Sequence, residues 1–153
     1  MQITLDLNKK QFERLLKIAY LGEWMINASR DNPLKEYEEI DDLIFSLAGQ
    51  FGLEKYYTHE PQDGNCYYPS RFFEEGTDVH KFREKYDEET FWDELIDRLG
   101  ERDFYRRYSE KEILAMTQKE RFIKVYEFID KWAEEINKNG IERLKIKKGG
   151  HMD

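Results

Sequence analysis

Residues 9–29 read KKQFERLLKIAYLGEWMINAS, and apolar side chains recur in them every three or four positions. This spacing predicts an amphipathic α-helix. Asn8 stands at the N-cap position, and Gln11 three residues later completes a capping-box pattern. The second half of the helix is apolar on nearly every side, which is typical of a helix at the centre of a fold. We therefore predict a central helix from about Lys9 to Ser29.

Glu23 is the most informative polar residue of this helix. Projection at 100° per residue places Glu23 on the apolar face, with Asn27 one turn later near the same face. The apolar neighbours on that face are Phe12, Leu16, Ala19 and Ile26. A carboxylate that faces a core must be neutralised, paired or hydrogen-bonded. The preferred interpretation is a satisfied structural network.

The alternative interpretation is a pocket whose polar floor is Glu23 and Asn27. A raised pKa would then make Glu23 a candidate catalytic proton acceptor. The walls of this pocket are predicted to be aromatic, with His59 or an arginine as a second polar group. The candidate ligand-binding residues are Glu23, Asn27, Trp24, Tyr20, Tyr67 and Tyr68.

A second helix is predicted after Asn32-Pro33, which fit an N-cap and a proline at the first helical position. Gly52 is its expected stop. One apolar stripe is predicted to line the buried face, and it comprises Tyr37, Ile40, Leu43, Ile44, Leu47, Ala48 and Phe51. The acidic residues are predicted to form a solvated face near the helix start, and they are Glu36, Glu38, Glu39, Asp41 and Asp42.

Helical periodicity fails between Leu53 and about Asp78, where prolines and glycines interrupt the chain. Connections of this length are usually functional or disordered, and six aromatic residues argue against disorder because they offer a large area to bury. A distorted hairpin that turns at Asp63-Gly64 is one conformation open to the segment. The aromatic residues either cover the helical core or form a binding groove, and they are Tyr56, Tyr57, Tyr67, Tyr68, Phe72 and Phe73.

The rest of the chain is predicted to be helical from near Val79, with an interruption at Gly100. Capping-box patterns that begin at Ser109 and Thr117 predict a short helix followed by a longer one. The longer helix is expected to end at Asn139-Gly140.

Alternating apolar and polar residues predict two short strands, one over residues 2–7 and one over 141–147. Their pairing, which the sequence leaves open, would give a two-stranded ribbon that joins the termini. We thus predict a mainly α fold, an irregular bundle of four to five helices around a central N-terminal helix. A single domain is expected over residues 1–148, with a flexible tail at 149–153.

The 153-residue chain carries 33 acidic and 25 basic side chains, a formal charge of −8. This charge argues against general binding to nucleic-acid phosphates and to anionic membrane surfaces. No apolar run is long enough to span a bilayer, and the N-terminus lacks a secretory pattern, so a cytoplasmic location is expected. Cys66 is the single cysteine, which fits a reducing compartment.

Motifs for cofactors and metals are missing. The sequence has no Gly-rich phosphate loop and no dinucleotide fingerprint, so no cofactor is expected. Neither His-Glu-x-x-His nor Cys-x-x-Cys occurs, and no metal site is predicted. The weak candidates for metal ligands are His59, Asp63 and His80.

Arg98, Arg102 and Arg106 are spaced by four residues and would form a basic ridge if the helix continues through Gly100. Arginine side chains suit carboxylates and phosphates, so these three are the candidate anion-binding residues. The preferred alternative is pairing with acidic neighbours one turn or less away.

Our preferred functional hypothesis is a non-catalytic interaction or regulatory module that binds another protein, or a second copy of itself, through the aromatic surface in residues 53–78. The alternative is an enzyme or small-molecule binder with a pocket at Glu23 and Asn27, with metal assistance as a variant. Whether the chain is an enzyme is left open. A nucleic-acid factor that uses residues 98–107 is the least favoured class because of the net charge.

Overall fold

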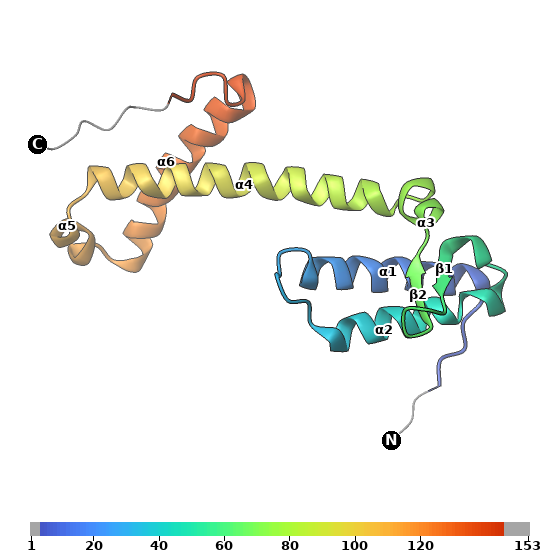
Figure 1. Ribbon diagram of the computed structural model, residues 1–153. Helices are drawn as coiled ribbons and strands as arrows, with labels where there is room; N and C mark the ends of the chain where they lie inside the picture. The colour runs from blue at the N-terminus through green and yellow to red at the C-terminus, as the bar shows by residue number, and fades with distance from the viewer. Residues whose placement is uncertain (1–3, 146–153) are drawn as a thin grey trace, which may run out of the picture. The chain divides into compact units, whose positions relative to one another are not determined.

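The computed structural model describes residues 4–145. Its fold is mainly α, as the sequence predicts, and a small two-stranded sheet is the β-structure among the described residues (Figure 1). Contacts divide the chain into two compact units, residues 1–86 and 87–153. A single domain over 1–148 stays a prediction, and the predicted tail at 149–153 lies outside the described residues.

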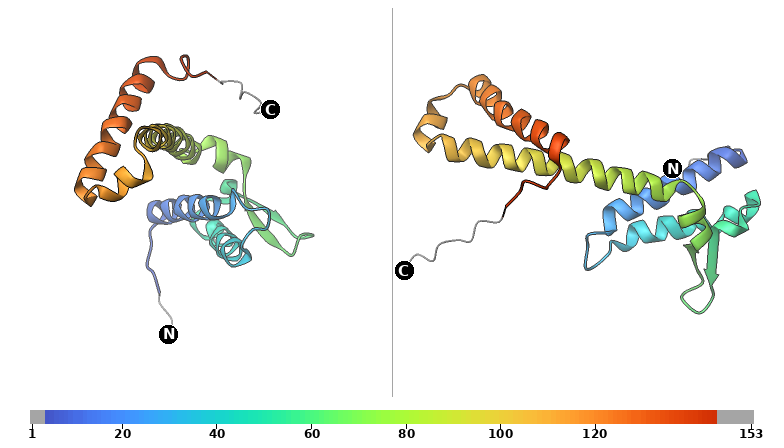
Figure 2. Two further views of the ribbon diagram at one scale, coloured as in Figure 1. Left: turned by 90° about the vertical axis from the view of Figure 1, so that its left-hand side faces the viewer. Right: turned by 90° about the horizontal axis from the view of Figure 1, so that it is seen from above.

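The amino-terminal unit combines α-helices, 3₁₀ turns and a hairpin. Its elements are α1 (Lys9–Asn27), α2 (Lys35–Ser46), η1 (Ala48–Phe51), η2 (Glu54–Tyr56), β1 (Tyr57–Glu60), β2 (Cys66–Pro69), α3 (Arg71–Gly76) and the start of α4 (Val79–Arg107). Helices α1 and α2 lie side by side, and β2 contacts α2 (Figures 1 and 2).

The start of α1 is fixed by the predicted capping box. The Asn8 side chain accepts a hydrogen bond from the Gln11 backbone N–H at 3.1 Å, and the Asn8 N–H donates to Gln11 Oε1 at 3.0 Å. At the other end, Asn27 Oδ1 accepts from the Leu34 N–H at 2.9 Å. Leu34 is thereby held as the N-cap of α2, so this helix begins at Lys35 rather than at the predicted Asn32-Pro33.

Helix α1 contributes to the core through one face. The buried hydrophobic cluster comprises Phe12, Leu16, Tyr20, Phe45, Ala48, Leu53, Tyr56, Phe73 and Val79. Phe73 packs edge-on against Tyr20 and against Phe45, with ring centroids 5.4 and 5.1 Å apart. On the opposite face, Ile18 and Met25 are exposed. The prediction that the second half of α1 is surrounded by the core is therefore wrong on this side.

Helix α2 buries a different face from the predicted one. Ile44, Ala48 and Phe51 are at least half-buried, but the remaining members of the predicted stripe are exposed: Tyr37, Ile40, Leu43 and Leu47. The cause is Phe45, which is fully buried against Phe73 and sets the rotation of the helix. Asp41 lies one turn before Phe45 on the same face and is 8% exposed. The predicted solvated acidic face is therefore wrong for Asp41.

The aromatic connection contains the hairpin that the sequence allowed at Asp63-Gly64. Strands β1 and β2 are antiparallel, with Tyr57 opposite Pro69 and Glu60 opposite Cys66. Gly64 and Asn65 both adopt positive φ angles, of 64° and 65°, which glycine and asparagine tolerate better than other residues. These residues reverse the chain and return β2 to the side of α2.

The carboxy-terminal unit contains the rest of α4, α5 (Glu110–Ala115) and α6 (Gln118–Asn139). Both predicted capping boxes are confirmed: Ser109 caps α5 together with Glu112, and Thr117 caps α6 together with Glu120. The predicted end of α6 is also confirmed, because the Gly140 N–H makes the last helical hydrogen bond, to Ile136 O at 2.8 Å.

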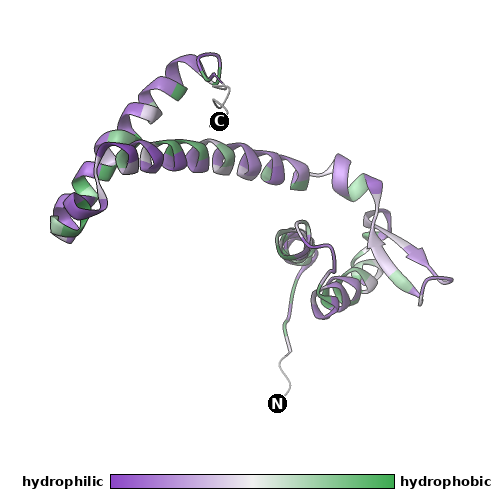
Figure 3. Cartoon of the chain, turned by 60° about the vertical axis from the view of Figure 1, so that its left-hand side comes forward, coloured by the Kyte–Doolittle hydropathy of each residue, from purple (hydrophilic) through white to green (hydrophobic). Residues whose placement is uncertain are grey.

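Helix α4 continues through Gly100, so the predicted interruption is wrong. A Cβ atom at this position would lie 2.6 Å from Ile129 Cγ1 and 2.8 Å from the Ile129 backbone. The glycine at position 100 therefore allows α6 to pack closely on α4 and does not end a helix. Hydrophobic and hydrophilic residues alternate along α4, as Figure 3 shows.

The predicted ribbon between the termini does not form in the described residues. Residues 4–8 have no strand conformation, and residues 141–145 are turn and coil. A hydrogen bond of 2.9 Å from the Leu144 N–H to Ile141 O closes this turn and removes the segment from an extended conformation. The other residues of the two predicted strands, 2–3 and 146–147, lie outside the described residues. Over residues 4–145, no helix has both the length and the apolar character needed to cross a membrane.

Candidate functional site

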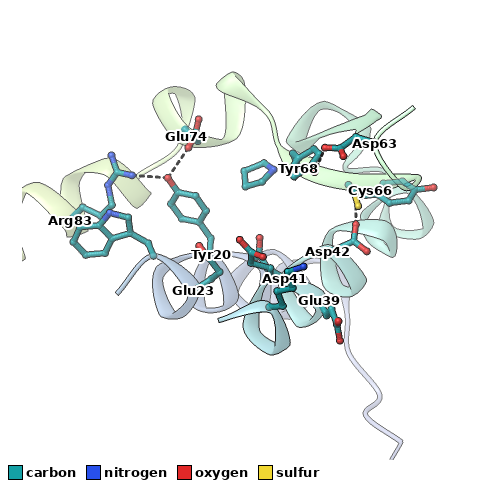
Figure 4. Close-up of a pocket in the computed structure, with 15 residues that line it drawn as sticks. Tyr20, Glu23, Glu39, Asp41, Asp42, Asp63, Cys66, Tyr68, Glu74 and Arg83 are labelled. Carbon is teal, nitrogen blue, oxygen red and sulfur yellow. Dashed lines mark hydrogen bonds between the residues drawn. The ribbon is translucent and has the colours of Figure 1, made fainter. Parts of the chain in front are cut away.

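A pocket of about 670 Å³ opens in the amino-terminal unit between α1, α2, the hairpin and the first turns of α4 (Figure 4). Its volume falls within the range of small-molecule sites. The lining residues are Tyr20, Glu23, Trp24, Lys35, Glu38, Glu39, Asp41, Asp42, Asp63, Cys66, Tyr67, Tyr68, Pro69, Glu74 and Arg83.

The pocket is strongly acidic. Seven of its lining residues carry a carboxyl group, against one lysine and one arginine. The walls also include aromatic side chains from two sides, Tyr20 and Trp24 from α1 and Tyr67 and Tyr68 from β2. Carboxylates combined with aromatic faces attract organic cations, since a ring adds cation–π attraction to the attraction between opposite charges.

Asp41 is the unusual residue of the pocket. Its side chain is more than nine-tenths buried, and no hydrogen-bond donor in residues 4–145 reaches its Oδ1 atom. Buried polar atoms in folded proteins are almost always hydrogen-bonded, because an unpaired one retains its desolvation penalty. Because Asp41 lines the pocket, a ligand bound there can supply a donor to this carboxyl group.

The surroundings of Asp41 also change its ionisation. Burial raises the pKa of Asp41 to about 7, and the nearby carboxylates of Glu23 and Asp42 add to this effect. Figure 4 shows these three side chains on the α1 and α2 side of the pocket. Near neutral pH the Asp41 carboxyl group is therefore divided between its neutral and its charged form, and a cation in the pocket would favour the charged form.

Glu23 lines the same pocket, and a catalytic role for it stays a prediction. Asn27 Nδ2 donates a hydrogen bond of 2.8 Å to Glu23 Oε1, and Glu23 is half-buried. Asn27 itself is buried beside the pocket and links Glu23 to the start of α2 through Leu34. Glu23 and Asn27 thus form the predicted structural network, while the Glu23 carboxyl group also contributes to the pocket wall.

The hairpin wall is fastened to α2 by a carboxylate. The Tyr67 backbone N–H donates a hydrogen bond to Asp42 Oδ1, so Asp42 positions β2 as well as lining the pocket. At the rim, the Tyr68 hydroxyl group donates to Asp63 Oδ2 at 2.6 Å, and this bond raises the pKa of Tyr68. The aromatic residues of β2 are therefore held in place by acidic residues.

Tyr20 connects α1 to two later elements. Its hydroxyl group donates to Glu74 Oε1 at 2.8 Å and accepts from Arg83 Nη1 at 2.7 Å. Burial is the main cause that raises the pKa of Tyr20 to about 12, and the hydrogen bond to Glu74 contributes. The Arg83 guanidinium also lies 5.5 Å from the Trp24 ring centre and 5.8 Å from that of Tyr20. Arg83 thus forms a positive end of an otherwise acidic pocket.

The structure brings together most of the candidate ligand-binding residues. Glu23, Trp24, Tyr20, Tyr67 and Tyr68 line the pocket, and Asn27 lies behind it. Sequence reasoning missed Asp41, Glu74 and Arg83. The position of Asp41 one turn before the large apolar residue Phe45 is a signal that could have identified its burial, whereas nothing local marks Glu74 or Arg83.

The weak metal-ligand candidates are not brought together. His59 Nε2 lies 2.8 Å from Asn65 Oδ1, and the ring stacks on Tyr67. Asp63 accepts from Tyr68 at the rim of the pocket, whereas His80 lines a separate depression of about 530 Å³. Within residues 4–145, no group of three or more His, Cys, Asp or Glu side chains is arranged to hold a metal ion.

The arginine ridge is present but paired within the chain. Arg98 contacts Glu94 at 2.8 Å, while Arg102 and Arg106 both contact Asp103, at 2.9 and 3.7 Å. The structure therefore shows the pairing that the sequence offered as the alternative to an anion site. Anion binding by the three arginines stays a prediction.

The aromatic residues of 53–78 divide between the core and the surface. Tyr56 and Phe73 are buried and belong to the hydrophobic cluster. Tyr68 and Phe72 are 42% and 45% exposed. The segment therefore covers the core and also offers some aromatic area at the surface, which includes one wall of the pocket.

Comparison of the chain with protein-family models, with curated proteins and with solved structures finds no significant match in any of the three.

Proposed function

We propose that the amino-terminal unit binds an organic cation, such as a protonated amine or a guanidinium group, in the acidic pocket. The observation that carries the proposal is Asp41, a residue of the pocket lining whose buried Oδ1 atom has no hydrogen-bond donor among residues 4–145. An ammonium or guanidinium group supplies donors only, so its chemistry complements an unpartnered carboxylate.

The rest of the pocket supports the same ligand class. Its excess of five carboxyl groups over cationic groups, seven against two, attracts positive charge before contact is made. Trp24 and the tyrosines offer ring faces for the cation and apolar area for an alkyl chain. Protein binding by residues 53–78, the preferred hypothesis from sequence, is supported less because Tyr56 and Phe73 of that segment lie in the core.

Isothermal titration calorimetry on the full chain tests the proposal. The probes are n-butylamine, cadaverine, spermidine and n-butylguanidine, with n-butanol as a neutral ligand of similar shape. Binding of at least one cation without binding of the alcohol is expected. Equal affinity for amine and alcohol, or no binding of any cation, would contradict the proposal.

The same cationic chemistry can come from a free amine or from the side chain of a basic protein. A second series of titrations uses acetylated, amidated tripeptides with Lys, Arg or norleucine at the centre. Tighter binding of the Lys or Arg peptide than of the free amines identifies a protein as the source, and the reverse order identifies a metabolite.

Two variants assign binding to Asp41. Asp41→Asn removes the charge and keeps the shape, and it is expected to lower cation affinity at least tenfold, the worth of one hydrogen bond to a charged group. Glu36→Gln is the matched control, because Glu36 is an exposed acid of α2 that does not line the pocket. Equal losses in both variants would show that only net charge matters.

Binding should depend on pH in a direction that follows from Asp41. Its pKa of about 7 leaves roughly one tenth of the group ionised at pH 6, so cation affinity is expected to fall about tenfold between pH 8 and pH 6. Near pH 7, cation binding should also release a proton from Asp41. Titrations in buffers of different ionisation enthalpy detect this release. A pH-independent affinity over this range would exclude Asp41 as the contact.

A further inference from the structure

The pocket has two ends of opposite charge. Asp41 lies at the acidic end, and Arg83 at the other end is held by Tyr20 and stacked near Trp24. Both charges act on the same hydroxyl group: Asp41 raises and Arg83 lowers the pKa of Tyr20. All three residues line the pocket, and Figure 4 shows Tyr20 between Arg83 and Asp41.

Arg83 also retains capacity for a ligand. Its guanidinium group has five N–H donors, and among the described residues one hydrogen bond is formed, to the Tyr20 hydroxyl group. No carboxylate in residues 4–145 forms a salt bridge with Arg83, although Glu74 is bound to the same tyrosine. An arginine placed by aromatic rings, with donors to spare, is suited to a planar anion.

We infer that the pocket is built for a zwitterion, a ligand with an ammonium group for Asp41 and a carboxylate for Arg83. This inference rests on the proposed function, since the ammonium group is the organic cation proposed above. A carboxylate fits better than a phosphate because the pocket already carries five more acidic than basic side chains, and a second negative charge adds repulsion. The ligand class is therefore an amino acid. The separation of its ammonium group and its carboxylate must match the distance between Asp41 and Arg83.

Paired ligands of equal length test the inference. Titrations of the full chain compare the ω-amino acids from glycine to 6-aminohexanoate with the n-alkylamines of the same number of carbons. At one chain length the amino acid is expected to bind at least tenfold more tightly than its alkylamine, since it adds a charge-assisted bidentate contact. Alkylamines that bind as tightly as the amino acids at every length would overturn the inference and leave the proposed function intact.

Variants locate the contact. Arg83→Gln is expected to abolish the preference for the amino acid, while n-alkylamine affinity should stay equal or rise because one positive charge leaves the pocket. Arg83→Lys should retain part of the preference. Arg14→Gln, which removes an exposed arginine of α1 that does not line the pocket, is the matched control and should keep the preference. A preference that survives Arg83→Gln overturns the inference, and failure of both ligand classes to bind the original chain overturns the proposed function with it.

Discussion

At the scale of the residue, the carboxyl group of Asp41 sets the properties of the pocket. Its burial lowers the stability of the charged form, because the carboxylate loses hydration and is close to the negative charges of Glu23 and Asp42. In addition, its Oδ1 atom accepts no hydrogen bond within residues 4–145. Asp42 on the next position differs, since it accepts a hydrogen bond from the Tyr67 backbone. The two neighbouring acids therefore have separate roles: Asp42 holds the hairpin, and Asp41 is left available.

Asp41→Asn is expected to stabilise the free protein at alkaline pH. The native pKa of about 7 exceeds the usual aspartate value of 3.8, so the native state binds more protons between these values and stability falls as the pH rises through them. The variant lacks this loss. Its gain in unfolding free energy should be small near pH 4 and reach roughly 2–4 kcal/mol at pH 8.

Urea denaturation of both proteins at several pH values checks this expectation. Glu36→Gln again provides the comparison, because an exposed acid of the same helix should change stability little at any pH. A constant difference between Asp41→Asn and the original chain across pH 4–8 would contradict the assigned ionisation.

At the scale of the element, local signals predicted the starts of α1, α5 and α6 but not that of α2. The capping boxes at Asn8, Ser109 and Thr117 are all present, because each depends on side chains three residues apart. The hairpin at Gly64 follows from equally local backbone preferences. Sequence could also place Tyr20 and Glu23 at one site, since they lie three residues apart on a single helix.

Features that depend on distant contacts were not predictable in the same way. The rotation of α2, and with it the burial of Asp41, is fixed by the packing of Phe45 on Phe73. Arg83 reaches the pocket because Tyr20, 63 residues earlier, receives its hydrogen bond. Glycine is a typical residue at the end of a helix, but Gly100 lies inside α4 and makes room for Ile129 of α6.

Two glycine substitutions should have opposite effects. Gly100→Ala places a Cβ atom within 2.8 Å of the Ile129 backbone and is expected to destabilise the carboxy-terminal unit by about 1–3 kcal/mol. Gly22→Ala in α1 meets nothing within 4 Å and should stabilise by about 0.5–1 kcal/mol, because alanine is the better helix former. Thermal and urea denaturation measure both, and stabilisation by both would show that α4 and α6 are not in close contact.

Removal of a cap tests the start of α6. Thr117→Ala deletes the hydroxyl group that accepts from the Glu120 N–H at 3.2 Å and is expected to cost about 1 kcal/mol. Lys119→Ala in the same turn is the control, since Lys119 is exposed and alanine favours the helix. Equal unfolding free energies for the two variants would contradict the capping role.

At the scale of the whole molecule, the chain has two sets of contacts and two small cores. The amino-terminal cluster is built around Phe45 and Phe73, while Gly100, Phe104 and Ile136 are the buried positions among residues 87–145. The pocket belongs entirely to the first unit. Its chemistry therefore depends on contacts within residues 1–86.

Hydrogen exchange should reveal this division. Gly100→Ala is expected to speed exchange of backbone amides in α6 and in α4 beyond residue 87, because their shared packing is weakened. Amides of α1 near Leu16 should keep their protection. Mass spectrometry of peptic fragments measures both regions, and equal acceleration in α1 and α6 would indicate one cooperative unit.

The solitary carboxyl oxygen of Asp41 also has an evolutionary consequence. Selection for thermal stability alone should replace Asp41 by asparagine, because this substitution raises the free energy of unfolding. If aspartate is kept at position 41 under such selection while surface positions change, the ligand of the pocket is still needed for function.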